Sequence, residues 1–371
     1  MKKANVISMI LAIALSLSVL LAGCGGAGGG AATSAPSGAP ASAAPAKASY
    51  KITIGGCCTE DHPITQALYK FKQLVEENSN GQIEVSVYPN SQLGSNRELF
   101  ESTQQGNTTV CEGGAVILAA FTDKFKFMQL PYLFNSSEAA YSFLSSNTGK
   151  ELCNAIADET NLYPLWFDEN GWQALTNSKR EIHSPADLNG IKLRTQENDI
   201  LLRLYTDIGA NPMPMAYTEL FTALQQGTVD GQVNPALIVQ TANFYEVQKY
   251  ITDVNAVYDF DFVGINYDFY KQLPDDLRKV VDDAAVVAQE QSLTDSRAAS
   301  DAAYAFLEDK ITVTHLTDEE RAAFVEAAQP TYEWFRSQNV EANLDKYMEQ
   351  VKISNDKYDA GQLENITGRD K

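Results

Sequence analysis

Histidine is scarce in this chain, and the common catalytic and metal-binding patterns are absent. Only three histidines occur, His62, His183 and His315, and their spacing fits no metal site. The sequence contains no GxSxG, P-loop or HExxH pattern. Its acidic runs, such as Asp282-Asp283, fall at helical positions and are typical of solvated helix faces. We therefore expect no enzymatic activity, no cofactor and no bound metal.

Positive charge is also in short supply. The chain has 28 lysines and arginines against 48 aspartates and glutamates, a formal net charge of −20. This balance disfavours nucleic acid and anionic lipid as partners. It does not disfavour a small anionic ligand, because one buried arginine outweighs a diffuse surface field over a few ångströms.

Cysteine is infrequent, and its spacing matches no zinc pattern. Apart from Cys24, the chain contains Cys57, Cys58, Cys111 and Cys153. The adjacent Cys57 and Cys58 are poorly placed to bridge each other, whereas one of them can pair with Cys111. Burial as small apolar side chains is at least as good an interpretation, so the state of these four thiols is left open.

The N-terminus has the pattern of a secretory signal. Lys2 and Lys3 precede an apolar stretch, residues 6–20, which is short for a membrane span and interrupted by serines. We expect a signal peptide over residues 1–23, ending in Leu-Ala-Gly. The following Cys24 resembles the acylated cysteine of bacterial lipoproteins, which implies an extracytoplasmic protein anchored to the membrane by a lipid on Cys24. An ordinary secreted protein and a transmembrane helix are the alternatives.

Residues 24–49 carry little besides Gly, Ala, Ser, Pro and Thr after the cysteine. Such a segment buries too little apolar surface to offset its ordering entropy, so we predict a flexible tether that spans roughly 25–30 Å. The membrane is then contacted only through the lipid anchor. About 320 residues follow, enough for two lobes of ordinary size.

Strand and helix signals alternate through the rest of the chain, which favours an α/β fold. Residues 51–55 and 83–87 have strand patterns, and apolar residues recur at helical spacing over 64–75. Ser95 and Glu98 form the pattern of a capping box that opens the next helix.

A short sequence motif occurs twice in the chain. Leu-Phe followed by Gln-Gln-Gly occurs over residues 99–106 and again over 220–227. The repeat indicates two lobes of related construction, with residues 111–113 and 232–234 at equivalent places on the two walls of a cleft. Residues 275–310 contain neither glycine nor proline, which predicts one helix about 50 Å long that can brace both lobes.

Arg194 ends a predicted strand that follows a turn. An arginine at the end of a strand can project into a cleft. There its planar guanidinium group can donate two hydrogen bonds to the two oxygens of a carboxylate. A surface arginine is the default alternative for an isolated match.

Several separate segments resemble the solute-binding proteins of TRAP transporters. They are residues 62–63, 88–94, 130–134, 188–194, 209–217, 219–235 and 245–250. The resemblance implies a two-lobed, periplasmic-binding-protein-like α/β fold with a ligand cleft between the lobes and a long helix bracing both. We expect the lobes to divide as residues 50–171 with about 260–299, and 172–259 with about 300–371.

The resemblance also implies roles for individual residues. Arg194 of the K-x-R motif pairs with the ligand carboxylate, and Asn234 of the G-Q-x-N-P motif helps to hold that group. Tyr217 lines the pocket. Glu112 supplies contacts from the other lobe.

The chain departs from the family pattern at Gln173, where many members carry an arginine. The change disfavours a dicarboxylate, and Gln173 with Trp172 better suits a neutral, hydroxyl-bearing or apolar ligand body. Downstream, Asp259 and Asp261 are expected near the pocket mouth. Asp261 with Glu112 can accept hydroxyl hydrogens from a sugar or pair with an ammonium group. A plain surface carboxylate is the alternative for Asp261.

We therefore predict a binding protein that captures a small monocarboxylate, with a sugar acid as the first choice, and delivers it to the membrane permease subunits of a TRAP transporter. A C4-dicarboxylate, an oxo acid and an amino-acid-like zwitterion are the alternative ligands. A ligand-sensing receptor for a membrane sensor kinase is the alternative role. We expect a monomer, because no helix has a coiled-coil pattern.

Overall fold

The computed structural model describes residues 49–338 and 343–364. The predicted signal peptide, Cys24 and the tether up to residue 48 lie outside these residues. Among the helices in the described part of the chain, none is long and apolar enough to cross a membrane.

A five-stranded mixed sheet forms the centre of the first lobe. Its strand order is β2-β1-β3-β10-β4. The strands are β1 (Tyr50–Gly55), β2 (Ile83–Tyr88), β3 (Val110–Gly114), β4 (Leu162–Trp172) and β10 (Tyr258–Asn266). β1 pairs in parallel with β2 and β3, whereas β10 runs antiparallel to both β3 and β4. A strand from late in the chain is therefore inserted between two early ones.

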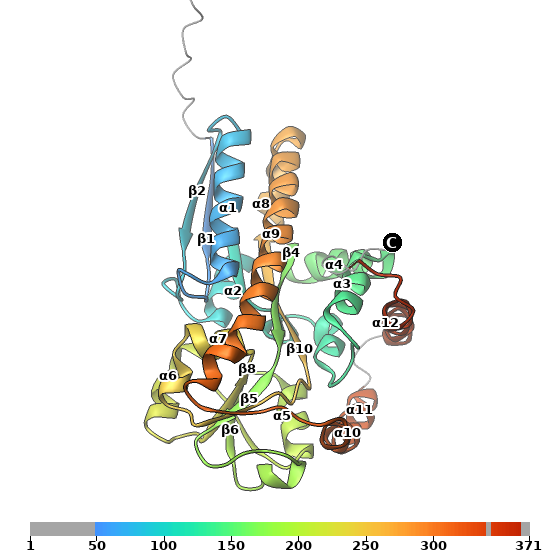
Figure 1. The fold of residues 1–371 in the computed structure, drawn as a ribbon. Helices are drawn as coiled ribbons and strands as arrows, with labels where there is room; N and C mark the ends of the chain where they lie inside the picture. The colour runs from blue at the N-terminus through green and yellow to red at the C-terminus, as the bar shows by residue number, and fades with distance from the viewer. Residues whose placement is uncertain (1–48, 339–342, 365–371) are drawn as a thin grey trace, which may run out of the picture. The chain divides into compact units, whose positions relative to one another are not determined.

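A six-stranded sheet forms the centre of the second lobe, in the order β11-β9-β5-β8-β6-β7. The strands are β5 (Ala174–Asn177), β6 (Lys192–Thr195), β7 (Asn211–Pro214), β8 (Gly231–Asn234), β9 (Tyr250–Thr252) and β11 (Thr312–Thr314). β6 pairs in parallel with β7 and β8, and β5 runs antiparallel to β8. The two sheets with their helices make the predicted two-lobed α/β fold (Figure 1).

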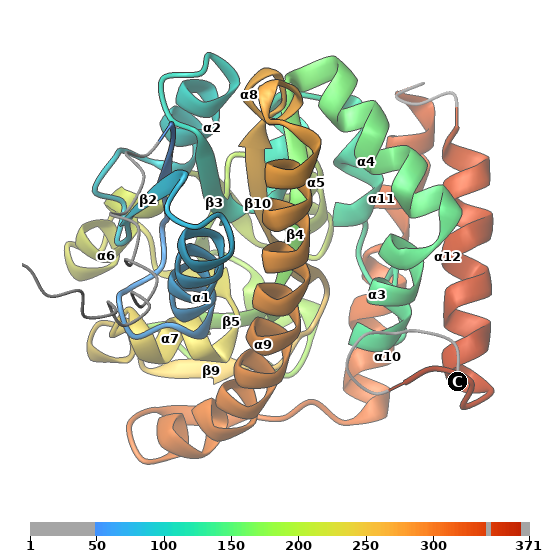
Figure 2. The same ribbon diagram turned by 90° about the horizontal axis from the view of Figure 1, so that it is seen from above.

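Helices cover both sheets. They are α1 (Pro63–Asn78), α2 (Asn96–Gln104), α3 (Ser137–Ser145), α4 (Asn147–Thr160), α5 (Asp199–Asp207), α6 (Tyr217–Gln225), α7 (Ala236–Thr241), α8 (Tyr267–Gln272), α9 (Asp275–Glu308), α10 (Asp318–Ala327), α11 (Gln329–Ser337) and α12 (Leu344–Asp359). In Figure 2, α12 lies beside α3 and α4, which it contacts. The C-terminal helices therefore touch elements that precede residue 171 as well as the second sheet's helix α5.

The local predictions for the first elements are confirmed. Residues 51–55 and 83–87 lie in strands, and residues 64–75 lie in α1. α2 begins with the predicted capping box: the Ser95 backbone N–H donates to Glu98 Oε2 at 2.8 Å, and the Glu98 N–H donates to Ser95 Oγ at 3.4 Å. Two otherwise unpaired donors at the helix start are satisfied in this way.

The two copies of the repeated motif have the same local structure. In each copy a helix ends before a glycine in the left-handed region, Gly106 with φ +79° and Gly227 with φ +71°. A short buried strand follows, β3 after α2 and β8 after α6. Glycine suits both positions because it has no Cβ to clash in this conformation.

The long helix is present as predicted, with α9 running unbroken over 34 residues. Val281 and Ala288 are buried in the core that α1 and the first sheet share. Ala303 and Leu307, at its other end, are buried in a core with α7 and strands of the second sheet. One rigid helix, orange in Figure 1, is thus packed into both lobes.

Two chain crossings between the lobes lie side by side. β4 ends at Trp172 in the first sheet and β5 begins at Ala174 in the second, so Gln173 alone joins them. The Gln173 N–H donates to Val257 O at 3.0 Å, and the Asn255 N–H donates to Gln173 O at 3.1 Å. The second crossing, between β9 and β10, is therefore hydrogen-bonded to the first.

Candidate functional site

A cavity lies between the two sheets, at the carboxyl ends of β1, β3, β6, β7 and β8. It holds about 610 Å³ of atom-free space, including its opening. The side chains that matter for its chemistry include Cys58, Asn170, Arg194, Tyr217, Asn234 and Asp261. Ligand clefts in open α/β sheets form at such strand ends.

Arg194 is the cationic centre of one wall. It is the third residue of β6 and only 1% exposed. Its Nε and Nη2 donate to the carbonyl oxygen of Met215 at 3.0 and 2.8 Å, which fixes the guanidinium plane. Its Nη1 has no hydrogen-bond partner, and no ion pair forms with it among the residues that the structure describes. Burial lowers the pKa of Arg194 to about 10, so the side chain stays protonated at neutral pH.

Asn234 and Tyr217 stand on the same wall. Asn234 is the last residue of β8, and its Nδ2 donates to Gln232 Oε1, which orients the amide. Tyr217 is the first residue of α6, and its ring packs edge-on against Phe244 at a centroid distance of 6.1 Å. Burial raises the pKa of Tyr217 well above its usual range, so its phenol remains a hydrogen-bond donor. The structure therefore brings together Arg194, Asn234 and Tyr217, the three residues predicted on this wall.

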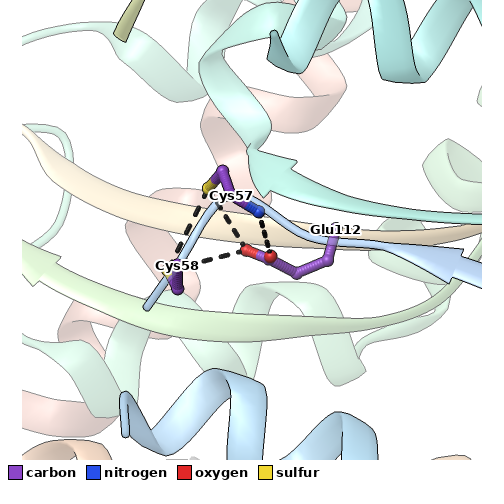
Figure 3. Close-up of side chains that lie close together, drawn as sticks. All are labelled: Cys57, Cys58 and Glu112. Atoms are coloured by element: carbon purple, nitrogen blue, oxygen red, sulfur yellow. Dashed lines mark hydrogen bonds between the residues drawn. The ribbon is translucent and has the colours of Figure 1, made fainter. Parts of the chain in front are cut away.

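Glu112 lies within the opposite wall, one layer behind the surface of the cavity. It projects from β3 and is fully buried, and it meets the segment that follows β1 (Figure 3). The backbone N–H of Cys57 donates to Glu112 Oε2 at 2.8 Å, and a Cβ at Gly56 would come within 2.5 Å of the same oxygen. Although these hydrogen bonds oppose it, burial raises the pKa of Glu112 to about 6.

Asp261 and Asp259 both lie inside the cavity rather than on the surface. They are 2% and 1% exposed and both line the cavity, so the surface interpretation of Asp261 was wrong. β10 carries them inward because it is a central strand of its sheet. Burial raises the pKa of Asp259 to about 6. Burial and then the charge of Glu112 raise the pKa of Asp261 well above its usual range.

Trp172 and Gln173 do not line this cavity, although both were predicted to contact the ligand. They lie at the chain crossing, which directs their side chains elsewhere. The Trp172 ring packs against Tyr258 at a centroid distance of 5.0 Å and borders two other hollows. Gln173 Oε1 accepts from the Tyr205 hydroxyl at 3.3 Å, and its Nε2 donates to Asp259 Oδ2 at 3.4 Å. Gln173 therefore reaches the site only through Asp259.

Cys57 and Cys58 line the cavity, which the sequence analysis did not foresee. They follow β1 directly, and their place after a central parallel strand was the signal available. All four cysteines of the described chain are free thiols. Cys111 Sγ donates to the carbonyl oxygen of Gly264 at 3.6 Å, so the pairing considered between Cys111 and Cys57 or Cys58 does not form.

Asn170 is a second residue that the sequence analysis missed. It lines the cavity just before β4 ends, and its Nδ2 donates to Asp259 Oδ2 at 3.1 Å. Its Oδ1 has no partner in the described part of the chain. The only sequence signal was its position three residues before Gln173, within the segment that precedes the crossing.

Comparison with known proteins identifies the family. The model of bacterial extracellular solute-binding proteins, family 7, matches residues 54–339. The chain belongs to this family. A solute-binding protein of Verminephrobacter eiseniae is 32% identical over 281 residues, 76% of this chain and 83% of that one. A C4-dicarboxylate-binding periplasmic protein of Shewanella loihica is 32% identical over 294 residues, 78% of this chain and 86% of the relative.

A solved structure gives the same result for the fold. The sugar acid binding protein of Advenella mimigardefordensis, in complex with galactonate, superposes with a TM-score of 0.79 at 31% identity. The match covers 83% of this chain and 99% of that one. Members of the family are extracellular or periplasmic binding proteins that serve TRAP transporters. The family and its structural neighbours are solute-binding proteins rather than enzymes, which confirms the prediction of no enzymatic activity.

Proposed function

We propose that this protein captures a small organic acid, with a sugar-acid monocarboxylate as the first choice, and delivers it to the membrane permease of a TRAP transporter. The observation that carries the proposal is Arg194, a buried cation with a free donor in a cavity between two lobes. A buried charge without a counter-ion is costly, so the site is built for a ligand that brings the missing negative charge.

The geometry around Arg194 suits a carboxylate. Met215 holds the guanidinium plane from one side, and Nη1 is left to donate. Asn234 and Tyr217 add polar groups on the same wall. Because truncating one partner of a buried, hydrogen-bonded charge pair costs about 2–5 kcal/mol, Arg194 should dominate the affinity.

The opposite wall favours a ligand body that carries hydroxyl groups. Asp261 and the Asn170–Asp259 pair present oxygen atoms that can accept hydroxyl hydrogens. A second ligand carboxylate would lie near these buried carboxyl groups, which disfavours a diacid. The galactonate complex of the Advenella relative supports a sugar acid. The Shewanella loihica relative, whose name specifies C4-dicarboxylates, makes such a diacid the second candidate.

The proposal includes how the protein works at the membrane. The lobes, divided as residues 50–171 with about 260–299 and 172–259 with about 300–371, close by a hinge at the paired crossings beside Gln173 while α9 stays continuous. After removal of the signal peptide, a lipid on Cys24 and the tether that follows hold the monomer near the permease. A short anchor keeps the local concentration of the binding protein high at its partner.

A thermal-shift panel tests the proposed ligand class. It contains aldonates, uronates, oxo acids, C4-dicarboxylates, amino acids and neutral sugars, each added to the wild type, Arg194→Ala and Arg336→Ala. Arg336 is an exposed residue of α11 and serves as the matched control.

We expect a sugar acid to raise the melting temperature of the wild type and of Arg336→Ala by mass action, and to leave Arg194→Ala unshifted. A response to neutral sugars alone, or an Arg194→Ala variant that binds within a few-fold of the wild type, would remove Arg194 from its role. If no compound of the panel raised the melting temperature, the proposed ligand class would be contradicted.

A further inference from the structure

Two thiols and a carboxylate converge in the wall of the cavity that faces Arg194 (Figure 3). Cys57 Sγ lies 4.0 Å from Cys58 Sγ. Glu112 Oε1 lies 3.6 Å from the first sulfur and 3.8 Å from the second. The three ligand atoms come from two chain segments more than 50 residues apart and meet within 4.8 Å of one another.

These distances match the edges of a tetrahedral metal site. With zinc–sulfur bonds of about 2.3 Å and zinc–oxygen bonds of about 2.0 Å, the tetrahedral angle sets sulfur–sulfur edges near 3.8 Å and sulfur–oxygen edges near 3.5 Å. The separations in this wall differ from those edges by about 0.1–0.3 Å. Small side-chain rotations are therefore enough to bring all three atoms into coordination.

The surroundings of the cluster are acidic. Asp261 Oδ2 lies 4.0 Å from Cys58 Sγ, and no cationic side chain of the described chain forms an ion pair with Glu112 or Asp261. The hydrogen bond from Cys58 lowers the pKa of Cys57, but burial and the charges of Glu112 and Asp261 raise it to about 12. A bound divalent cation reverses this situation, because it balances the carboxylates and stabilises the thiolates.

Although the sequence predicts no bound metal, we propose that Cys57, Cys58 and Glu112 form a site for a thiophilic divalent cation of the Zn²⁺ type. Two sulfur donors select such an ion over Mg²⁺ or Ca²⁺, which take oxygen ligands. The protein supplies three donors, and the two cysteines line the cavity, so the fourth coordination position opens toward the bound solute. The three donors can bind a cation whether or not the solute is an organic acid, so the site goes beyond the proposed function.

The backbone supports the cluster independently of any metal. The Cys57 N–H holds Glu112 Oε2 at 2.8 Å, which leaves Oε1 directed at the sulfurs. Gly56 permits this approach because it lacks the Cβ that would lie 2.5 Å from the carboxylate. The carboxylate is thus oriented before a cation arrives, as ligands of preorganised metal sites are.

Cobalt titration of the reduced full chain tests the site. Co²⁺ serves as the spectroscopic probe for Zn²⁺, because thiolate ligands give it a charge-transfer absorption whose intensity follows the number of sulfurs. The variants are Cys57→Ser/Cys58→Ser, Glu112→Gln and the matched control Cys153→Ser, a half-buried cysteine of α4 outside the cluster. The melting curve of each variant checks that it folds.

We expect one Co²⁺ per chain, with a band of two-thiolate intensity that Zn²⁺ displaces. The double cysteine variant should lose the band, Glu112→Gln should bind at least tenfold more weakly, and Cys153→Ser should match the wild type. If the double variant does not fold, Cys57→Ser alone should halve the band. Absence of a thiolate band from the reduced wild type, or a band unchanged in the cluster variants, overturns the proposal.

Discussion

Replacement of Asp261 by asparagine should stabilise the ligand-free protein by an amount that grows with pH. Asp261 is 2% exposed, and burial and the charge of Glu112 hold its pKa well above the ordinary value of 3.8. Between its unfolded and its folded pKa, Asp261 therefore holds a proton in the folded wild type that the unfolded chain has already released. Asparagine has nearly the same shape as aspartic acid but does not titrate. The variant therefore does not lose stability through the protonation of this side chain as pH rises.

Proton linkage gives the sign and the size of the change in stability with pH. Since the folded pKa is the raised one, the stabilising contribution of Asp261 is complete below about pH 3.8 and is lost progressively as pH rises toward the folded pKa. One proton corresponds to about 1.4 kcal/mol per pH unit. The stability of the variant relative to the wild type should thus rise with pH by up to about 1.4 kcal/mol per pH unit, for as long as the folded wild type alone holds the proton.

Urea unfolding at pH 5, 6 and 7 measures this difference. A chelator is present throughout, because a cation bound beside Glu112 would mask the effect. Asp295→Asn, at an exposed position of α9, is the control that removes a charge without removing a buried one. A stability difference between Asp261→Asn and the wild type that stays constant with pH would refute the reasoning.

Two further predictions concern the anchor and the second sheet. Cys24→Ala should move the protein from the membrane fraction to the soluble fraction of cells, and an unchanged distribution on an immunoblot would contradict lipidation of Cys24. Gly231→Ala should lower the free energy of unfolding by about 1–3 kcal/mol or more, because its Cβ would come within 2.2 Å of the Thr176 carbonyl oxygen. Gly114→Ala, whose nearest neighbour would be at 3.5 Å, should cost much less in the same denaturant titration, and equal losses would contradict the steric argument.

The parts of the fold that depend on local signals could be predicted from the sequence. The absence of glycine and proline over residues 275–310 was enough to predict the long helix, since these two residues are the least favourable in a helix interior. Ser95 and Glu98 mark a helix start because both hydrogen bonds of a capping box are local. The insertion of β10 between β3 and β4 could not be predicted, since it depends on pairing between segments about 150 residues apart.

The difference between local signals and long-range contacts also decides which site residues could be predicted. Arg194, Tyr217 and Asn234 end or follow strands and lie in motifs that resemble the family, so their common wall could be anticipated. The contact between Glu112 and Cys57 joins β3 to the segment that follows β1, and neither segment's sequence indicates it. Gln173 was misplaced for a related reason: the chain crosses between sheets at this residue, and a motif gives no indication of where a crossing directs a side chain.

The charges of the cavity also bear on which acids it accepts. Arg194 offers one positive charge, whereas the facing wall holds Asp259, Asp261 and, behind them, Glu112. Without a cation in that wall, a second ligand carboxylate would be repelled by Asp259, whose pKa of about 6 leaves it mostly ionised at neutral pH, so hydroxyl groups are the better partners there. With a divalent cation bound to Cys57 and Cys58, the same wall can instead coordinate an oxygen of the ligand. The proposed metal site and the choice between a sugar acid and a diacid are therefore coupled, and a ligand panel measured with and without Zn²⁺ separates them.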